Sequence, residues 1–318
     1  MNISRSISSR MRTTVIVLCL GLPSAALAQE PPPEYVSTSL SATVTMIEGR
    51  GGNVAVSFGD DGVFVIDDQF ADISSALVEE VGRITGQPIR FLVNTHYHGD
   101  HVGGNAAFAE KGAVIIAHDN VYQRMSTEQF SSFMNSTTEP WPTGALPVVS
   151  FSERMSLRMN GEIAAIHHVA NAHTDGDSIV HFPVSNVIHM GDTFFNGFYP
   201  YIDLDGGGSI KGFIAALEVG IGLADANTKI IPGHGPVTGV AELQRYRDTV
   251  VKVRDKVQAL IDQGKTLEQA IEAKPTAEWD EAMGKGFIGP AQLVTFIYNS
   301  LTGVNQFTRI EANTAESH

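Results

Sequence analysis

The sequence predicts an α/β protein in which helices pack over two β-sheets. A strand, helix, strand alternation between residues 62 and 117 indicates helices lying over a first sheet. Short strand-like runs between residues 148 and 190 indicate a second sheet. The chain has 318 residues, of which 43% are hydrophobic and 18% charged, and no long internal linker, so we expect one large globular domain.

The first 28 residues have the features of a secretory signal peptide. A basic start with three Arg precedes an apolar stretch over residues 13–22, and Ala-Leu-Ala at 26–28 provides a small-residue cleavage site. The apolar stretch is broken after about ten residues, whereas roughly 20 are needed to span a bilayer. We therefore expect export across the inner membrane to the periplasm, without a stable membrane anchor.

Removal of this segment changes the composition in two ways. It removes Cys19, the only cysteine, so the mature protein has neither a disulfide nor a thiolate metal ligand. It also removes three Arg, which leaves 18 basic against 35 acidic residues, a net charge of −17. Such a surface repels phosphate backbones and anionic membranes. The charge disfavours nucleic acid as a partner and favours a small-molecule substrate; the sequence carries no signal for an oligomeric state.

The first half of the chain predicts a meander followed by βαβ units. Residues 29–40, with three consecutive Pro, predict an extended arm that is poorly ordered or lies along the surface. The Gly-rich turn at 49–52 is either a mobile flap over a site or a plain hairpin tip. The expected elements are antiparallel strands over 42–47, 53–58 and 62–66, a helix over 71–85, a buried strand over 88–94, a short helix over 103–111 and a strand over 113–117.

The second half predicts further strands and then helices. Residues 119–133 favour a helix, and the loop at 134–146 carries Trp141 between two Pro, where it either shapes a pocket or is simply buried. The expected strands are 148–151, 155–159, 163–168, 178–182, 187–190 and 229–231, and the expected helices are 212–223, 241–263, 267–273, 277–283 and 292–301. We expect residues 41–318 to form one domain, with a helical C-terminal part over about residues 241–303.

Residues 95–101, Thr-His-Tyr-His-Gly-Asp-His, hold three imidazoles and one carboxylate close together in the sequence. Three imidazoles and a carboxylate within six residues do not suit a core, because each would need its own buried partner. His96 and His98 are two apart, so on a continued strand both would point the same way, which suits two ligands of one ion. Asp100 and His101 follow a Gly that lets the chain turn, which suits ligands of a second ion. A polar loop that happens to be rich in His is the weaker alternative.

Three later turns add one imidazole or carboxylate each. His173, Asp192 and His234 each follow an apolar strand and have Gly nearby, a context that aims a side chain into a shared cleft. The other histidines lack this context. Structural roles are expected for His118, His167, His168, His181 and His189, and a place in the tail for His318.

The motif and the three turns together resemble the metallo-β-lactamase superfamily, whose hallmark is H-x-H-x-D-H followed by a later His, Asp and His. The resemblance extends from about residue 41 to residue 241 and fills all seven positions in order. It implies an αβ/βα four-layer sandwich, with two β-sheets face to face, helices outside and metals at one edge. The implied ligands of two zinc ions per chain are His96, His98 and His173 for the first ion, Asp100, His101 and His234 for the second, and Asp192 as the bridge.

The resemblance also implies a reaction. Two zinc ions about 3.5–4 Å apart lower the pKa of a shared water towards neutrality, which supplies a bridging hydroxide for cleavage of an acyl C–N or C–O bond. Asp100 is expected to orient this hydroxide and to pass its proton to the leaving group, and with Asp192 it forms the predicted catalytic pair.

Two features bear on the substrate and point in opposite directions. β-Lactamases with a thiolate on the second zinc carry Cys where this chain has Asp192, and Gly191-Asp192-Thr193 resembles the bridging Asp of glyoxalase II-like thioesterases and lactonases. Export, however, favours substrates met outside the cytoplasm, such as β-lactams and lactones. We therefore predict β-lactam-type ring hydrolysis, with a lactonase or thioesterase as the alternative.

A further alternative is a mononuclear-iron oxidoreductase of the persulfide dioxygenase type. This type uses mainly the positions of His96, His98, His173 and Asp192 on one ion. Because the second set of ligands is also complete in this chain, we favour two zinc ions.

The candidates for substrate contact are weaker. Phe195 and Tyr201 follow Asp192 and suit an aromatic wall beside the metals, although core packing explains them equally well. Lys211, after a run of three Gly, is the candidate for a substrate carboxylate, with a solvated Lys at a helix start as the alternative. Trp141 is the remaining candidate.

Overall fold

The computed structural model describes residues 34–303 of the chain, so the predicted signal peptide lies outside the described residues. Seven strands form the first sheet, in the order β1 (Val36–Ser39), β2 (Val44–Glu48), β3 (Val54–Gly59), β4 (Gly62–Ile66), β5 (Ile89–Val93), β6 (Val114–His118) and β9 (Val149–Phe151). The first four pair antiparallel, which confirms the meander, and β4, β5, β6 and β9 pair parallel. The segment predicted as an arm thus contributes β1, which pairs with β2.

Six strands form the second sheet, in the order β10 (Arg154–Met159), β11 (Glu162–His168), β12 (Ser178–Phe182), β13 (Val187–His189), β14 (Lys229–Ile231) and β15 (Thr238–Gly239). All neighbours are antiparallel except β13 and β14. The prediction that all the strands after residue 148 form this sheet is wrong for β9. This strand pairs parallel with β6, because its connection, residues 119–148, carries the chain back to the edge of the first sheet.

Hydrophobic side chains that alternate along the strands hold the two sheets face to face. Phe64 of β4 and Phe182 of β12 meet between the sheets, with ring centroids 6.1 Å apart. The neighbouring β4 residues Val63 and Val65 are fully buried on the other face. Because successive strand residues point to opposite faces, one strand supplies both layers of core.

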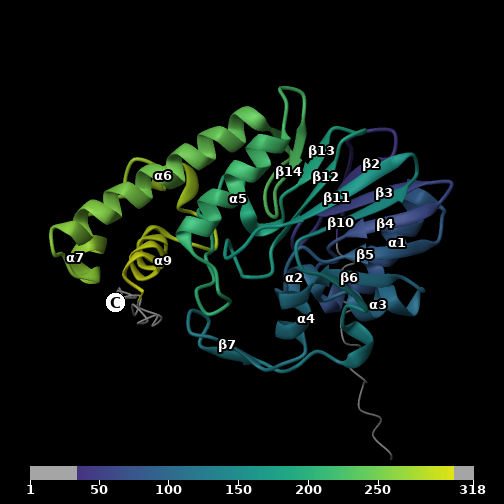
Figure 1. Cartoon of the computed structure of the whole chain (residues 1–318), viewed down its shortest axis with the longest axis horizontal. Coiled ribbons are helices and arrows are strands. Elements are labelled where there is room, and N and C mark those ends of the chain that lie inside the picture. Colours follow the sequence, from purple (N-terminus) through teal and green to yellow (C-terminus); the bar gives the residue numbers. More distant parts are fainter. Residues whose placement is uncertain (1–33, 304–318) are drawn as a thin grey trace, which may run out of the picture. The chain divides into compact units, whose positions relative to one another are not determined.

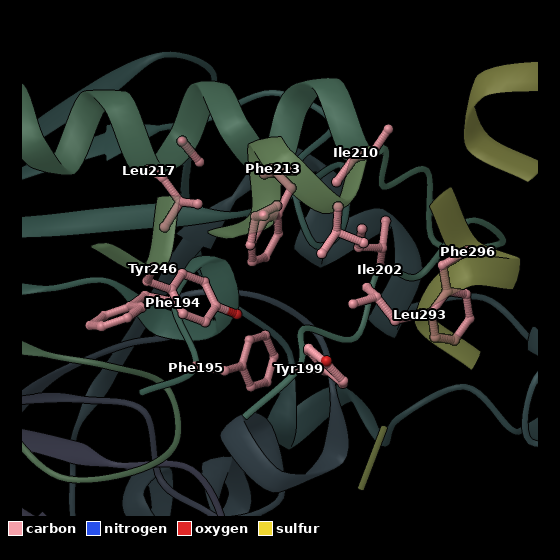
Figure 2. Packing of buried hydrophobic residues seen from close by; sticks show 14 of the residues in the cluster. Phe194, Phe195, Tyr199, Ile202, Ile210, Phe213, Leu217, Tyr246, Leu293 and Phe296 are labelled. Carbon is pink, nitrogen blue, oxygen red and sulfur yellow. The ribbon is translucent and has the colours of Figure 1, made fainter. Parts of the chain in front are cut away.

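Helices cover the outer face of each sheet. The first sheet packs against α1 (Ser74–Thr85) and α3 (Asn105–Glu110), and the second against α5 (Ile210–Leu223) and α6 (Val240–Asp262) (Figure 1). α9 (Pro290–Thr302) packs against α5 and α6. Figure 2 shows Phe213 and Leu217 of α5 directed toward Phe194 and Tyr246. The order helix, sheet, sheet, helix confirms the four-layer αβ/βα sandwich.

The remaining elements are short. They are α2 (Gly99–Val102), α4 (Asp119–Met125), α7 (Leu267–Glu272), α8 (Asp280–Met283), the strands β7 (Gln129–Ser131) and β8 (Ser136–Thr138), and the 3-10 turns η1 (Ala71–Ile73), η2 (Thr143–Ala145) and η3 (Gly191–Thr193). Within residues 34–303, no helix has both the length and the apolar character needed to cross a membrane.

The helix predicted over residues 119–133 is wrong in its second half. α4 ends at Met125, and residues 129–138 form the hairpin of β7 and β8 instead. The hydroxyls of Ser126 and Thr127 both donate to the carbonyl of Gln123, at 3.1 and 2.8 Å, and Trp141 N–H donates to the Met125 carbonyl at 2.8 Å. These bonds satisfy the last carbonyls of α4, as caps do at a helix end. The helix predicted over residues 277–283 is likewise shorter, since α8 begins only at Asp280.

Candidate metal centre

The His-rich motif lies in a turn at the edge of the first sheet. β5 ends at Val93 and α2 begins at Gly99, so the strand does not continue through His96 and His98. Instead, the carboxylate of Asp67 accepts a hydrogen bond from Thr95 N–H at 2.7 Å and one from the Thr95 hydroxyl at 2.8 Å. These bonds form just after β5 ends, and the Thr95 carbonyl accepts from Ser178 N–H of β12 at 2.9 Å, so the motif begins beside the second sheet.

The first group of candidate ligands comprises His96, His98, His173 and Asp192. Each offers one ligand atom, and these atoms all lie within 4.8 Å of one another. Nε2 of His173 is 2.9 Å from Nδ1 of His98. Asp192 Oδ2 lies 3.6 Å from Nε2 of His173 and 3.8 Å from Nε2 of His96. Loops that follow β11 and β13 therefore bring His173 and Asp192 to the motif.

The second group comprises Asp100, His101 and His234, again with ligand atoms within 4.8 Å of one another. Oδ2 of Asp100 is 3.2 Å from His234 Nε2 and 3.5 Å from His101 Nε2. The other oxygen of Asp192, Oδ1, is 3.1 Å from His101 Nε2 and 3.5 Å from His234 Nε2. Asp192 thus lies between the two groups, with one oxygen toward each.

The donor atoms fit metal ions. His96 Nε2, His101 Nε2 and Asp192 Oδ1 are buried and have no well-aligned hydrogen bond to any described residue. Buried polar atoms are nearly always paired, since an unpaired one costs about 1–3 kcal/mol. Three such atoms within the two ligand groups indicate sites able to bind metal ions, and a set of imidazoles and carboxylates suits zinc.

Electrostatics support the same conclusion. Burial lowers the pKa of His96 well below its ordinary value and that of His173 to about 4, so both rings are neutral, as ligation requires. Burial opposes protonation of His101 and His234 too, but the surrounding carboxylates outweigh it, chiefly Asp192, and raise the pKa of His234 to about 9. In the absence of metal, protonated His101 and His234 therefore supply the positive charge beside Asp100 and Asp192.

Three outer partners orient the ligating rings. Asp67 Oδ2 lies 2.8 Å from His101 Nδ1, and Asp203 Oδ2 lies 2.9 Å from His98 Nε2. His173 Nδ1 donates to the carbonyl of Tyr201 at 2.7 Å. Each bond fixes the ring and turns its other nitrogen toward the centre. Asp67 and Asp203 were missed from the sequence, because they lie 34 and 105 residues from the rings they contact.

The Gly-rich turn at residues 49–52 packs against the second ligand group. Gly52 N–H donates to the Asp100 carbonyl at 3.1 Å, and Asn53 N–H donates to the Gly233 carbonyl at 2.8 Å. A Cβ added at Gly52 would lie 2.1 Å from Cε1 of His101, so the backbone here touches the imidazole ring. The turn joins the antiparallel strands β2 and β3, which agrees with the hairpin interpretation, and it also contacts the second ligand group.

Of the four predicted substrate residues, Tyr201 and Phe195 lie against candidate ligands, whereas Trp141 and Lys211 make no ring contact or hydrogen bond with them within residues 34–303. Tyr201 stacks on His98, with centroids 5.6 Å apart and planes at 17°, and Phe195 stacks on His234 at 5.6 Å and 4°. Phe195 is also part of the core under α5 (Figure 2). Trp141 packs on the core of Val102, Ala117, Val121 and Met125, and Lys211 is exposed in the first turn of α5.

Several of the remaining histidines have structural partners. His189 Nε2 donates to the Asn53 carbonyl at 3.0 Å, and its Nδ1 accepts from Gly191 N–H at 3.1 Å. His118 stacks on His168 with centroids 3.6 Å apart. These contacts agree with the structural roles predicted for them.

Comparison with known families decides the identity of the fold. The sequence profile of the metallo-beta-lactamase superfamily matches residues 47–234, which include all seven candidate ligands. The chain belongs to the metallo-beta-lactamase superfamily. The matched region ends at His234, and the chain continues with β15 and α6 to α9.

Solved structures share the metallo-beta-lactamase fold at low sequence identity. A metallo-beta-lactamase from Pontibacter korlensis superposes with a TM-score of 0.56 and 16% identity, covering 68% of this chain and 99% of that one. The sec-alkylsulfatase Pisa1 from Pseudomonas sp. superposes with a TM-score of 0.63 and 15% identity, covering 85% of this chain and 51% of that one. At such identities the likeness concerns the fold alone.

One similar protein of known activity is the 2,4-dinitroanisole O-demethylase subunit alpha of Nocardioides sp. (strain JS1661). It is 24% identical over 155 residues, which cover 48% of this chain and 44% of that protein. The match therefore spans less than half of either chain. Superfamily membership and the His/Asp groups indicate a metal-dependent, hydrolase-like enzyme.

Proposed function

We propose that the protein is a dinuclear zinc hydrolase that cleaves an acyl C–N or C–O bond, with β-lactam-type rings as the first substrate class and lactones or thioesters as the alternative. The observation that carries this proposal is the position of Asp192, with Oδ2 near His96 and His173 and Oδ1 near His101 and His234. A carboxylate placed between two complete ligand groups suits a bridge between two ions.

The chain's residues have defined roles in this proposal. When bound, zinc ions supply Lewis acidity and a nucleophile available at neutral pH. Asp192 holds the two ligand groups at a fixed separation. Asp100 is partly exposed, with 23% of its side chain accessible, and this exposure supports a role in passing a proton to a leaving group.

The partial exposure of the site also indicates where substrate enters. The side chains of His98 and His234 are 19% and 30% exposed, whereas those of His96, His101 and His173 are almost fully buried. Substrate therefore approaches from the side of His98, Asp100 and His234.

Metal analysis tests the proposal first. Purified protein should contain two zinc ions per chain, and the Asp192→Ala variant should lose both stoichiometric binding and activity. One iron per chain, with oxygen consumption in the presence of a persulfide, would instead establish the mononuclear oxidoreductase. The complete second group argues against that outcome.

A substrate screen tests the reaction. The zinc-loaded protein should hydrolyse at least one of a penicillin, an acyl lactone and an acyl thioester, and chelation should abolish the activity. Because two similar proteins are named as a sec-alkylsulfatase and a 2,4-dinitroanisole O-demethylase subunit, a secondary alkyl sulfate and 2,4-dinitroanisole belong in the same screen. Turnover of these two alone would contradict the acyl assignment.

Export to the periplasm is part of the proposal. It is supported by the basic, apolar and small-residue segments of residues 1–28. Fractionation of cells that express the full chain, followed by mass spectrometry of the N-terminus, should find the mature protein in the periplasmic fraction and beginning at Gln29. A full-length chain in the cytoplasm would contradict this.

A further inference from the structure

Tyr201 connects the candidate metal centre to a second group of aromatic rings. Its ring stacks on His98 and meets the edge of His173, with centroids 5.6 and 5.4 Å apart. Its carbonyl accepts the hydrogen bond from His173 Nδ1. The Tyr201 ring is therefore held beside the first ligand group.

Three phenylalanines from distant segments meet Tyr201. Phe133, in the turn of the β7–β8 hairpin, lies 5.3 Å from Tyr201, 5.2 Å from Phe296 of α9 and 5.6 Å from Phe287, between ring centroids. Tyr201 in turn lies 5.3 Å from Phe296 and 6.2 Å from Phe287. Figure 2 shows Phe296 beside Leu293 on α9. We call Phe133, Tyr201, Phe287 and Phe296 the aromatic cluster.

The cluster reaches the surface. Phe287 is 66% exposed although it contacts two rings of the cluster, and Phe130 and Met134 of the same hairpin are 56% and 54% exposed. A contiguous patch of exposed apolar side chains is typical of a binding site. The cavity between Ser132, Tyr201, Asp203 and Phe296 measures only about 10 Å³, which is the size of one water. A ligand group would therefore lie against the rings rather than inside the cavity.

Charge narrows the kind of group that fits. The carboxylate of Asp203 borders the cavity and already accepts from Tyr97 and Gly206 as well as contacting His98. Asp205 also borders it and accepts from Ser132 N–H at 2.7 Å. Both acids disfavour an anionic group here, and the three phenylalanines of the cluster offer only apolar ring faces. The occupant that suits it is uncharged and apolar, and aromatic groups gain most from ring contacts.

We propose that the aromatic cluster binds an uncharged aromatic or bulky apolar substituent of the substrate, attached next to the acyl bond that is cleaved beside His98. This inference rests on the proposed hydrolase function and defines its substrate class. Tyr201 belongs to the cluster and also contacts the first ligand group, which favours a substrate over a protein partner.

A binding measurement tests the cluster without any catalysis. The probe is N-phenyl-1-naphthylamine, a neutral aromatic fluorophore, titrated into zinc-loaded full-length protein. The Phe287→Ala variant should weaken its binding by about three- to tenfold, the loss expected for one ring contact. The matched control is Val184→Ala, because Val184 is 70% exposed but precedes β13, at the end of that strand opposite Asp192. Unchanged binding in Phe287→Ala, or equal loss in the control, overturns the inference.

A substrate pair tests the same site during turnover. For whichever bond class the screen identifies, the phenylacetyl derivative should have a kcat/KM about tenfold or more above that of the acetyl derivative. Phe287→Ala should reduce this ratio by about three- to tenfold, and Phe287→Leu should reduce it less. Turnover with equal rates for the pair overturns the inference alone, whereas absence of turnover for every bond class contradicts the proposed function and leaves the probe titration to decide the cluster.

Two other occupants are outcomes of the same experiments. Sedimentation that shows a dimer in the wild type and a monomer in Phe287→Ala would assign the cluster to a second copy of the chain. Probe binding that occurs only after removal of residues 304–318 would assign it to that segment. Either result overturns the proposal.

Discussion

The carboxylate of Asp67 lies 2.8 Å from Nδ1 of His101, and both side chains are fully buried. Asp67 has a positive φ of 62°, and its two oxygens also accept the bonds from Thr95 that begin the motif turn. One buried acid therefore both shapes the turn and fixes His101 with Nε2 toward the second ligand group. Such outer partners raise the basicity of a ligating imidazole and set its orientation.

Replacement of this acid should weaken metal binding. Asp67→Asn keeps the size of the side chain and tolerates a positive φ, but it removes the charge beside His101. We expect the affinity for the second zinc to fall by about 10–100-fold, measured by competition with a chromophoric chelator. The control is Asp72→Asn, since Asp72 is an exposed acid of the same segment that pairs with Arg50. Two equally tight sites in Asp67→Asn would contradict the assigned role.

Gly52→Ala should displace His101. The added Cβ would lie within 2.1 to 2.8 Å of three atoms of the imidazole, and Asn53 beside it is tied to the Gly233 carbonyl, so the backbone has little freedom to retreat. We expect one zinc ion per chain instead of two, measured by atomic absorption after dialysis. Gly82→Ala is the matched control, because nothing lies within 4 Å of its added Cβ, and there the change should stabilise α1 by about 0.5–1 kcal/mol.

Asp203 and Tyr97 should contribute unequally to the first ligand group. Asp203 contacts His98 Nε2 directly at 2.9 Å, whereas Tyr97 acts through Asp203, to which its hydroxyl donates at 2.5 Å. Asp203→Asn should therefore lower the affinity for the first zinc by about 10–100-fold. Tyr97→Phe should have a smaller effect on the same titration. An equal or larger loss in Tyr97→Phe would show that the hydroxyl acts independently of Asp203.

Asp177 should make stability depend on pH. Burial raises the pKa of Asp177 from its ordinary 3.8 to about 7, although Thr174 N–H and hydroxyl donate to its oxygens at 2.8 and 2.6 Å. The folded chain thus holds a proton that the unfolded chain releases above about pH 4. Its contribution to stability is complete below the unfolded pKa and is lost as pH rises towards 7, on the order of 1.4 kcal/mol per pKa unit.

Urea unfolding of the metal-free protein between pH 4.5 and 8 measures this contribution. The free energy of unfolding of the wild type should fall with rising pH relative to that of Asp177→Asn, whose amide does not titrate. The difference between the two should be constant above about pH 7.5. Parallel curves over the whole range would show that Asp177 is ionised in the folded protein.

Local patterns predicted most elements because the signals are short-range. Alternation along residues 62–66 and helical spacing over residues 74–85 reflect burial of one face, which each segment expresses by itself. The errors fall where distant contacts decide. The backbone N–H of Trp141 bonds to the Met125 carbonyl at the end of α4, and β9 joins the first sheet because β6 offers it a parallel edge.

The sequence by itself determined the chemistry of the site: the H-x-H-x-D-H turn and the three later Gly-flanked residues contain all seven side chains of the two groups. Ligand type and spacing are properties of the chain, so they can be read without coordinates. The tertiary structure decided what surrounds them. Asp67, Gly52 and Asp203 reach the ligating rings, and Phe133 and Phe287 reach Tyr201, only because the packed sheets and helices bring together segments far apart in the chain.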